Sequence, residues 1–286
     1  MKSIYQKRTR IGDNILKVLI YLAAGVAIAL LVGIMGYVFV RGLPQVSLQL
    51  LSTVQSSLKG TFGILGNIIN TIYIIVITLI IAAPIGIGSA IYLNEYAKPG
   101  KLVRTIEFTT EILSGIPSII FGLFGMVFFG MTLKLGYSVL TGSFTLTLMV
   151  LPLITRNTQE ALKTVPDSYR SGALGIGATK WYMIRTILLP SAAPGILTGV
   201  ILSIGRIVGE SAALLFTAGS GFQLPKNLFG KLFESSGTLT IQLYLSMQKA
   251  KYDQAFGIAV VLLIIVLGIN LLTRFLTNRF DVTKLK

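Results

Sequence analysis

The sequence predicts an all-α polytopic membrane protein with six transmembrane helices. Hydrophobic residues make up 53% of the 286-residue chain and charged residues only 12%, whereas soluble domains carry about 25% charged residues. Apolar runs of about 18 or more residues recur along the chain, as bilayer-spanning helices require. The alternation in roughly 10-residue units that marks a membrane β-barrel is absent from the sequence.

Six apolar segments are long enough to cross a bilayer. We expect them at residues 18–40, 67–93, 111–133, 139–154, 193–218 and 255–276. The first follows a basic start but lacks a cleavage site, so we interpret it as a retained span. Residues 41–66 are too polar to span, and we expect a short surface helix there. The chain then divides into residues 1–66, with the first span, and a five-span core at residues 67–286.

The basic residues predict the orientation of these spans. With six spans, both termini lie on one side, and 17 of the 25 Lys and Arg residues fall on that side, against seven on the other and one inside a span. Basic loops stay in the cytoplasm, so we expect both termini and the loop at residues 155–190 to be cytoplasmic. The net charge of +15 then reflects topology, and we expect a lipid bilayer around the chain and no nucleic acid partner.

The composition excludes several kinds of active site. The chain has no Cys and no His, which excludes disulfides, Cys-ligated zinc or iron–sulfur sites, His-ligated haem and nucleophiles activated by His. Asp and Glu total only 10, so a membrane enzyme would have few groups to work with. We expect no metal or cofactor in this chain.

The loop at residues 155–190 is long for a simple connection. Asp167 and Ser168 are helix N-cap residues, and we expect a short amphipathic helix after them that ends at a turn. The residues expected on that helix are Tyr169, Arg170, Ala173, Leu174 and Ile176, with Gly175 and Gly177 as the stop and Trp181 in a second helix that Pro190 and Pro194 break. The short helix suits either a groove on a partner protein or an interfacial cap on the bundle.

The fifth span carries two charges at membrane depth. Arg206 lies 13 residues into it, roughly 20 Å along a helix that rises about 1.5 Å per residue. A central Arg costs about 2.5–3.5 kcal/mol to insert, and Glu210, four positions on, can pair with it. One interpretation is an internal ion pair that fixes helix packing. The other is that Arg206 binds an oxyanion in transit and Glu210 keeps that binding weak enough for release.

The third span contains the sequence Ser-Gly-Ile-Pro-Ser at residues 114–118. Pro117 and Gly115 predict a kink, and the freed backbone groups and Ser114 either line a polar path or only bend the helix. Glu107 and Glu111, near the cytoplasmic end of this span, are expected to be solvated or to favour the helix N-terminus.

Two motifs carry a resemblance to a known family. Ser171-Gly172-Ala173, three residues, Gly177, nine residues, then Ile187-x-Leu189-Pro190 resembles the EAA loop of bacterial ABC-importer permeases, with Ser171 and Gly172 in place of the motif's Glu and first Ala. In the fifth span, Arg206-x-x-Gly209-Glu210-Ser211 is similar to the Arg-x-x-Gly-Glu-Thr segment of phosphate-importer permeases. The short N-terminal region is closer to the PstA type of that family than to the PstC type.

The resemblance implies a type I ABC-importer permease fold in the bacterial cytoplasmic membrane and alternating-access transport of inorganic phosphate. It implies a PstC-like second permease, two ATP-binding subunits that hold ATP and Mg, and an extracytoplasmic phosphate-binding protein. The chain itself lacks a Walker A sequence, because Ala178 stands where the Lys would be. A permease for sulfate or molybdate, and an ion-coupled secondary carrier, remain as alternatives.

The resemblance also assigns residue roles. Coupling to the ATPase falls to Ser168, Tyr169, Arg170, Ser171, Gly172, Ala173, Leu174 and Gly177. The substrate path falls to Arg206, Glu210, Ser211, Ser114 and Pro117.

Overall fold

A computed structural model describes residues 11–56, 60–225 and 227–280. Five helical segments in these ranges are long and apolar enough to cross a membrane, and a bent pair supplies a sixth if it is counted as one span. The long helices are α1 (Ile11–Gly42), α3 (Leu65–Ile91), α6 (Val139–Lys163), α9 (Leu189–Gly209) and α12 (Tyr252–Phe280). The bent pair is α4 (Lys101–Gly115) and α5 (Ser118–Gly125), which continues as a π-helical segment at Met126–Thr132.

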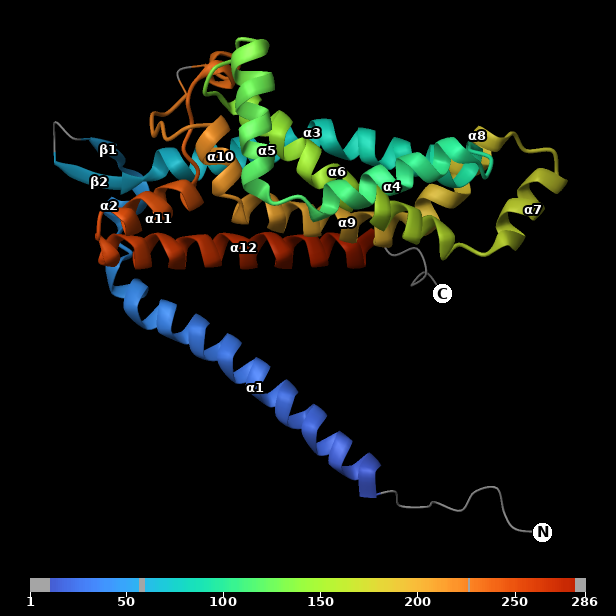
Figure 1. Cartoon of the computed structure of the whole chain (residues 1–286), viewed down its shortest axis with the longest axis horizontal. Coiled ribbons are helices and arrows are strands. Elements are labelled where there is room, and N and C mark those ends of the chain that lie inside the picture. The colour runs from blue at the N-terminus through green and yellow to red at the C-terminus, as the bar shows by residue number, and fades with distance from the viewer. Residues whose placement is uncertain (1–10, 57–59, 226, 281–286) are drawn as a thin grey trace.

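Helices α3, α6 and α9 form the centre of the bundle, with α6 in contact with both others (Figure 1). Their shared core is aliphatic and includes Ile74, Leu146, Met149 and Ile207. Two buried threonines of α6 satisfy their hydroxyls within the helix: Thr145 donates to the carbonyl of Thr141 at 2.7 Å, and Thr147 donates to the carbonyl of Ser143 at 2.8 Å. These two side chains therefore lie in the core at little cost, whereas the buried hydroxyl of Thr158 has no hydrogen-bond partner among the described residues.

Helix α1 leaves the rest of the bundle (Figure 1) and packs on α12. At Gly42, an added Cβ would lie 2.3 Å from the carbonyl oxygen of Phe256 and 2.6 Å from the side chain of Val260. The last turn of α1 therefore needs a glycine to approach α12, while most of the helix exposes its apolar side chains.

The chain after α1 forms a small outer layer. It contains α2 (Leu48–Ser52) and an antiparallel hairpin of β1 (Val54–Ser56) and β2 (Thr61–Ile64), in which Val54 pairs with Ile64. Leu50 and Ile64 pack with Leu239 of α11 (Leu239–Gln248) and Ile258 of α12. The short helix expected in this stretch is confirmed, and the hairpin is an addition that the sequence did not indicate.

Two buried asparagines near the start of α3 hold the second outer segment, which leads from α10 (Ala212–Thr217) to α11. Asn67 Nδ2 donates to the carbonyl of Gly237 at 2.9 Å, and Asn70 Nδ2 donates to the carbonyl of Gly221 at 3.0 Å. These bonds fix irregular backbone against the bundle, where an unpaired carbonyl would be costly.

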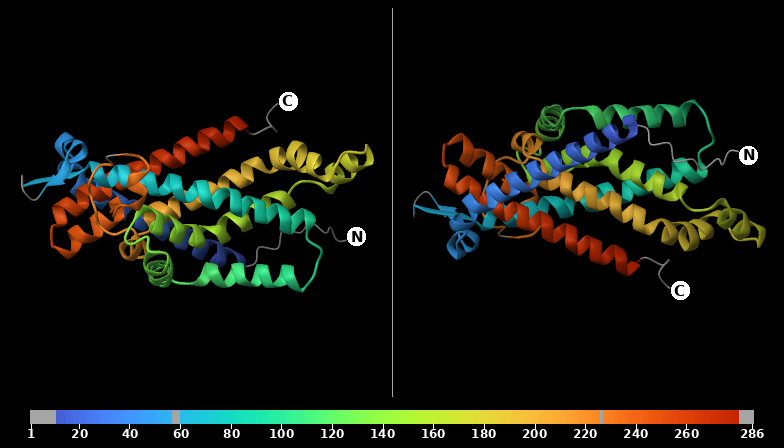
Figure 2. Two further views of the ribbon diagram at one scale, coloured as in Figure 1. Left: turned by 90° about the horizontal axis from the view of Figure 1, so that it is seen from above. Right: turned by 90° about the horizontal axis from the view of Figure 1, so that it is seen from below.

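The third apolar segment differs from the single kinked span that we expected. Helix α4 begins at Lys101, ahead of the expected start, and α5 leaves it at 103°. Figure 2 (left) shows α5 nearly end-on while α4 lies along the bundle. Pro117 lacks an N–H and restricts Ile116, which is extended at φ −70° and ψ 130°. The predicted kink is therefore a complete break.

The prolines at the start of the fifth span do not break the helix, contrary to expectation. Helix α8 (Lys180–Met183), a π-helical turn at Ile184–Leu188 and α9 follow one another without a gap. Pro190 comes directly after the π-helical turn at Ile184–Leu188, an irregularity at which a helix can accommodate a proline, and Pro194 lies within α9. The cytoplasmic loop therefore ends at α8, about ten residues earlier than Pro190 suggested.

Both described chain ends point the same way. The first turn of α1 and the last turn of α12 lie toward the end of the bundle that carries α7 (Asp167–Gly175) (Figure 1). We call this the inner end. It matches the predicted placement of both termini and residues 155–190 on one side.

Candidate functional site

Helix α7 projects from the inner end between α6 and α8 (Figure 1). It begins at Asp167, with Pro166 at the N-cap and no side-chain cap, so the predicted capping by Asp167 or Ser168 is wrong. Gly177 follows in the left-handed region at φ +83°, where glycine is strongly favoured. The predicted short helix and glycine turn are confirmed.

The residues of this segment that we assigned to coupling face two ways. Those that are exposed are Ser168, Tyr169, Ser171, Gly172, Leu174 and Gly177. Ala173 is buried in a cluster with Leu162 and Met183. Arg170 is also turned inward, with 19% of its side chain exposed. The outward face, with Ile176 and Trp181 also exposed, is the part available to a partner.

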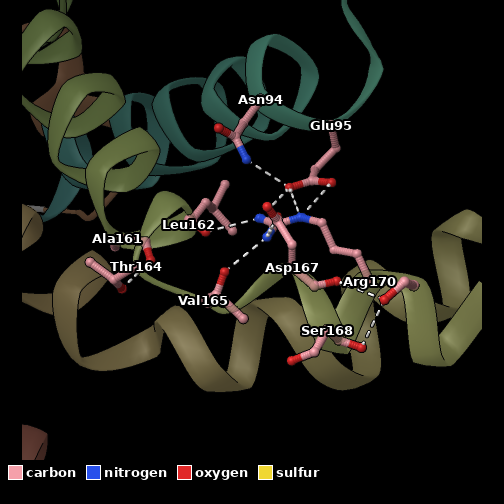
Figure 3. Close-up of polar contacts among 10 residues, drawn as sticks. Asn94, Glu95, Ala161, Leu162, Thr164, Val165, Asp167, Ser168 and Arg170 are labelled. Atoms are coloured by element: carbon pink, nitrogen blue, oxygen red, sulfur yellow. Dashed lines mark hydrogen bonds and ion pairs between the residues drawn. The ribbon is translucent and has the colours of Figure 1, made fainter.

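Arg170 is held by six hydrogen bonds (Figure 3). Its Nη2 lies 2.9 Å from Glu95 Oε1, and its Nε lies 3.2 and 3.4 Å from Glu95 Oε1 and Oε2. The guanidinium also donates to the carbonyls of Leu162 and Val165, each at 2.9 Å, and to Asp167 Oδ1 at 3.0 Å. All three nitrogens of the planar guanidinium therefore donate hydrogen bonds, and these bonds fix its orientation.

The two carboxylates around Arg170 differ sharply in burial. The Glu95 side chain is 4% exposed and the Asp167 side chain 97% exposed. Hydrogen bonding to Glu95 is the main cause that raises the pKa of Arg170 above its ordinary value, against an opposing effect of burial. Arg170 is thus charged at any physiological pH, and Glu95 is its dominant partner.

Glu95 belongs to the end of α3. It lies in a π-helical turn at Tyr92–Tyr96, and Asn94 Nδ2 donates to its Oε1 at 2.7 Å. The adjacent Tyr96 makes a second contact with the loop, since Lys180 Nζ lies 4.9 Å from its ring centroid, within cation–π range. The end of α3 therefore contacts the loop at two places, within α7 and at the start of α8.

The sequence did not indicate these partners. Glu95 lies in a short charged stretch that follows the second expected span, and 75 residues separate it from Arg170. The local sequence gives one weak sign of the pair: the apolar helix ends in Asn-Glu-Tyr at 94–96. An acidic residue at the C-terminal end of a helix opposes the helix dipole, so Glu95 is unfavourable there without a cationic partner.

A cavity of about 300 Å³ opens between α4 and α6, near the inner end. Its polar lining includes Glu107, Glu111 and Glu160 with Arg156 and Lys163. Arg156 and Glu111 form a loose pair at 3.8 Å with both side chains well exposed. The interpretation of Glu107 and Glu111 as solvated residues agrees with their exposure.

The fifth apolar segment breaks at the two residues that follow Gly209. Helix α9 ends there, Glu210 is extended at φ −81° and ψ 122°, and α10 starts at Ala212. Glu210 Oε1 accepts from the backbone N–H of Ala213 at 3.0 Å, and its carbonyl accepts from Thr240 Oγ1 at 2.9 Å. Glu210 therefore supports the start of α10 and the end of α9.

The predicted Arg206–Glu210 ion pair is wrong. The pairing required a continuous helix, and the helix ends between the two residues. Within the described ranges, no ion pair involves Arg206, which is half-buried in the last turn of α9, and Ser211 is half-buried beside the break. The guanidinium is left without an intrachain carboxylate, so the packing interpretation loses its basis.

The two broken segments lie side by side and run in the same direction. Gly122 of α5 faces Ala213 of α10, and Gly125 of α5 approaches Thr217 of α10. This register places the start of α5, just after Pro117, level with the Glu210 break. Ser114 and Pro117 are exposed before that start, and Ser114 Oγ donates to the carbonyl of Glu111 at 2.7 Å.

Comparison with known proteins places these features in a family. The family model described as "Binding-protein-dependent transport system inner membrane component" matches residues 82–283. The chain is 34% identical over 282 residues to the "Probable ABC transporter permease protein YqgI" of Bacillus subtilis (strain 168), covering 93% of this chain and 95% of that protein. It is 32% identical over 281 residues to the "Phosphate transport system permease protein PstA" of Mycobacterium leprae (strain TN), covering 95% and 91%.

Solved structures of bacterial ABC transporters resemble the fold. A chain of the bacterial alginate ABC transporter, in complex with an alginate pentasaccharide-bound periplasmic protein, matches with a TM-score of 0.69 at 16% identity, covering 94% of this chain and 96% of that one. A chain of the inward-facing MetNI methionine ABC transporter matches with a TM-score of 0.57 at 20% identity, covering 76% and 94%. At these identities the likeness is one of fold.

Proposed function

This chain belongs to the family of binding-protein-dependent transport system inner membrane components and is a permease subunit of an ABC importer, and from this premise we propose that its substrate is inorganic phosphate. It has the type I importer permease fold and is a multi-pass protein of the inner membrane. The observation that carries the substrate proposal is the likeness to PstA proteins over nearly the whole chain. The unpaired Arg206 beside the helix break gives that likeness a physical basis.

Phosphate would cross the membrane through the region of the two helix breaks, one between α9 and α10 and the other between α4 and α5. Arg206 offers a planar fork of donors that suits a tetrahedral oxyanion, and no intrachain carboxylate neutralises it. Glu210 and Ser211 lie at the break, and Ser114 and Pro117 lie before the neighbouring α5. In this proposal Glu210 does not pair with Arg206 but would limit how tightly the anion binds, so that it can be released.

The driving force would come from separate subunits. The exposed face of α7, with Tyr169 and Leu174, would seat in a groove of an ATP-binding subunit that holds ATP and Mg. Two such subunits would close on ATP binding, and α7 would carry the motion to the bundle in an alternating-access cycle. This chain would contribute no catalytic residue to hydrolysis.

Two further partners complete the proposed importer. A PstC-like permease would supply the other half of the path and cover part of the exposed apolar surface. An extracytoplasmic phosphate-binding protein would dock at the outer end, where Leu228 and Phe229 are exposed near the η5 turn (Gly230–Phe233).

Another oxyanion is the main alternative substrate. The name of the Bacillus subtilis relative gives no substrate, and the two structural neighbours described above are named for methionine and alginate. Sulfate and molybdate share the tetrahedral shape of phosphate, so an arginine fork accepts all three. Competition between the unlabelled oxyanions and labelled phosphate separates these substrates.

The test is phosphate uptake by the reconstituted importer with the variant Arg206→Gln, with ATPase activity measured in parallel. We expect uptake to collapse while assembly and ATPase activity persist. Arg41→Gln, the same charge change at an exposed residue at the outer end of α1, should leave uptake near the wild-type rate. Unchanged uptake in Arg206→Gln would remove Arg206 from the path, and uptake without any ATPase subunit would favour a secondary carrier.

A further inference from the structure

We propose that Glu95 is the positioning residue through which movement of α7 reaches α3. The inference rests on the proposed role of α7 as the contact with the ATPase.

Helix α7 has two covalent neighbours in the bundle and one neighbour that it reaches only through space. It follows α6 and precedes α8 and α9 along the chain, so these helices feel any displacement of α7 directly. Helix α3 has no such connection, although it lies along α6 in the centre of the bundle. If α3 is to move with α7, a contact between them must transmit the force.

Within the described ranges, the polar contacts between the end of α3 and the loop are Glu95 with Arg170 and Tyr96 with Lys180. Ile87 and Ile91 of α3 also pack against the apolar cluster beneath α7. Apolar contacts allow sliding, whereas a carboxylate that accepts three bonds from one guanidinium fixes both distance and angle. The Glu95–Arg170 pair is therefore the contact that sets the orientation of α7 against α3.

The burial of the pair argues for positioning over simple stabilisation. A buried ion pair adds little net stability compared with an apolar replacement, because desolvation offsets the attraction. The loss of one partner, however, leaves a buried charge unpaired. The pair is thus a poor means of strengthening the fold and an effective means of specifying one arrangement.

The helices on both sides of the contact are locally widened. Glu95 lies in the π-helical turn Tyr92–Tyr96, and a second π-helical turn, Ile184–Leu188, joins the loop to α9. Such turns are frequent at functional sites. Here one irregular turn holds Glu95 itself and the other separates the loop from α9, so that α7 can tilt as a unit and pull the end of α3 with it.

A matched control exists on the same arginine. Asp167 also pairs with Arg170, at 3.0 Å, but it is highly exposed and belongs to α7 itself. Asp167→Asn makes the same charge change as Glu95→Gln, yet it leaves the contact with α3 intact. The proposal predicts that only the second substitution disconnects α3.

The experiment follows α3 directly. The chain has no cysteine, and Gly88 of α3 is exposed, with no atom within 4 Å of an added Cβ, so Gly88→Cys provides one thiol in this chain. In the complete reconstituted complex, the rate of labelling at this thiol is measured without nucleotide and with ATP under conditions that block hydrolysis. ATPase activity, complex yield and phosphate moved per ATP are measured on the same preparations.

We expect ATP to change the labelling rate in the Gly88→Cys parent and in its Asp167→Asn derivative. In the Glu95→Gln derivative we expect this response to disappear, with ATPase activity retained and phosphate moved per ATP reduced about fivefold or more, the size of a typical coupling between sites. An undiminished response in Glu95→Gln, or an equal loss in Asp167→Asn, would overturn the proposal.

A second variant covers the case in which Glu95→Gln fails to assemble. Arg170→Lys keeps the charge balance but replaces the fork by a single point donor, so the complex should form and the α3 response should still fall. A wild-type response in Arg170→Lys would refute the proposal. Because labelling and ATPase activity require no phosphate, a complex that moves no phosphate but passes these tests would contradict the substrate assignment alone.

Discussion

Replacing Gly122 by Ala tests the side-by-side placement of α5 and α10. An added Cβ at Gly122 would lie 2.8 Å from the Cα of Ala213 and 3.2 Å from its carbonyl oxygen. Ordinary contacts lie at 3.4–4 Å, so the shortest contact falls 0.6 Å short of that range. The obstructing atoms are backbone atoms, which cannot rotate away, and the two short helices must separate.

The expected cost follows from this overlap. Overpacking a core by a methyl group typically costs about 1–3 kcal/mol, while Gly-to-Ala in a helix gains up to about 1 kcal/mol in propensity. Gly268→Ala in α12 is the matched control, because no atom lies within 4 Å of its added Cβ. The difference between the two variants isolates the overlap.

The assay is thermal inactivation of the purified importer in detergent, read as the fraction that elutes as intact complex after heating. For chains of 150–250 residues, about 1 kcal/mol shifts the midpoint by roughly 2–4 °C, so Gly122→Ala should melt at least about 2 °C below Gly268→Ala. Equal midpoints would mean that α5 and α10 are not packed in this register, and the placement of the two breaks at one level would fail with it.

The remaining predictions concern the loop, the outer segment and the inner cavity. Gly177→Ala places a Cβ on a left-handed residue and should cost about 1–2 kcal/mol and lower ATPase coupling, whereas Gly175→Ala, with open space around it, should leave both unchanged. Asn70→Ala leaves the carbonyl of Gly221 without its side-chain donor and should lower thermal stability by about 1–3 kcal/mol; a wild-type midpoint would show that water replaces it. Glu111→Gln removes an exposed pair and should change stability by less than about 1 kcal/mol, and a larger effect would mean that a partner subunit buries this cavity.

The apolar segments and the α7 helix were predictable because their signals are local. Hydropathy over a window of about 20 residues identifies a span, and the glycine that closes α7 adopts the conformation that only glycine favours. The family motif and the basic loops pointed to the same inner end. None of these features depends on what lies against them in space.

The features that the sequence did not indicate all depend on distant contacts. Glu95 and Arg170 meet across 75 residues, and the hairpin forms where outer residues pack on α11 and α12. The tolerance of Pro190 depends on the irregular turn before it. In each case, the structure depends on residues that lie outside the short sequence pattern from which the prediction was made.

The break at Glu210 shows why such distant contacts matter for function. A helix inside a bilayer ends only where its freed backbone groups find other partners. Glu210 provides one, through its carboxylate at the N–H of Ala213, but the hydroxyl that pairs its own carbonyl comes from Thr240, 30 residues later. The sequence Gly-Glu-Ser at 209–211 therefore permits a break, and the outer segment makes it stable. The same break separates Glu210 from Arg206, so the fold that stops the helix also leaves the arginine unpaired.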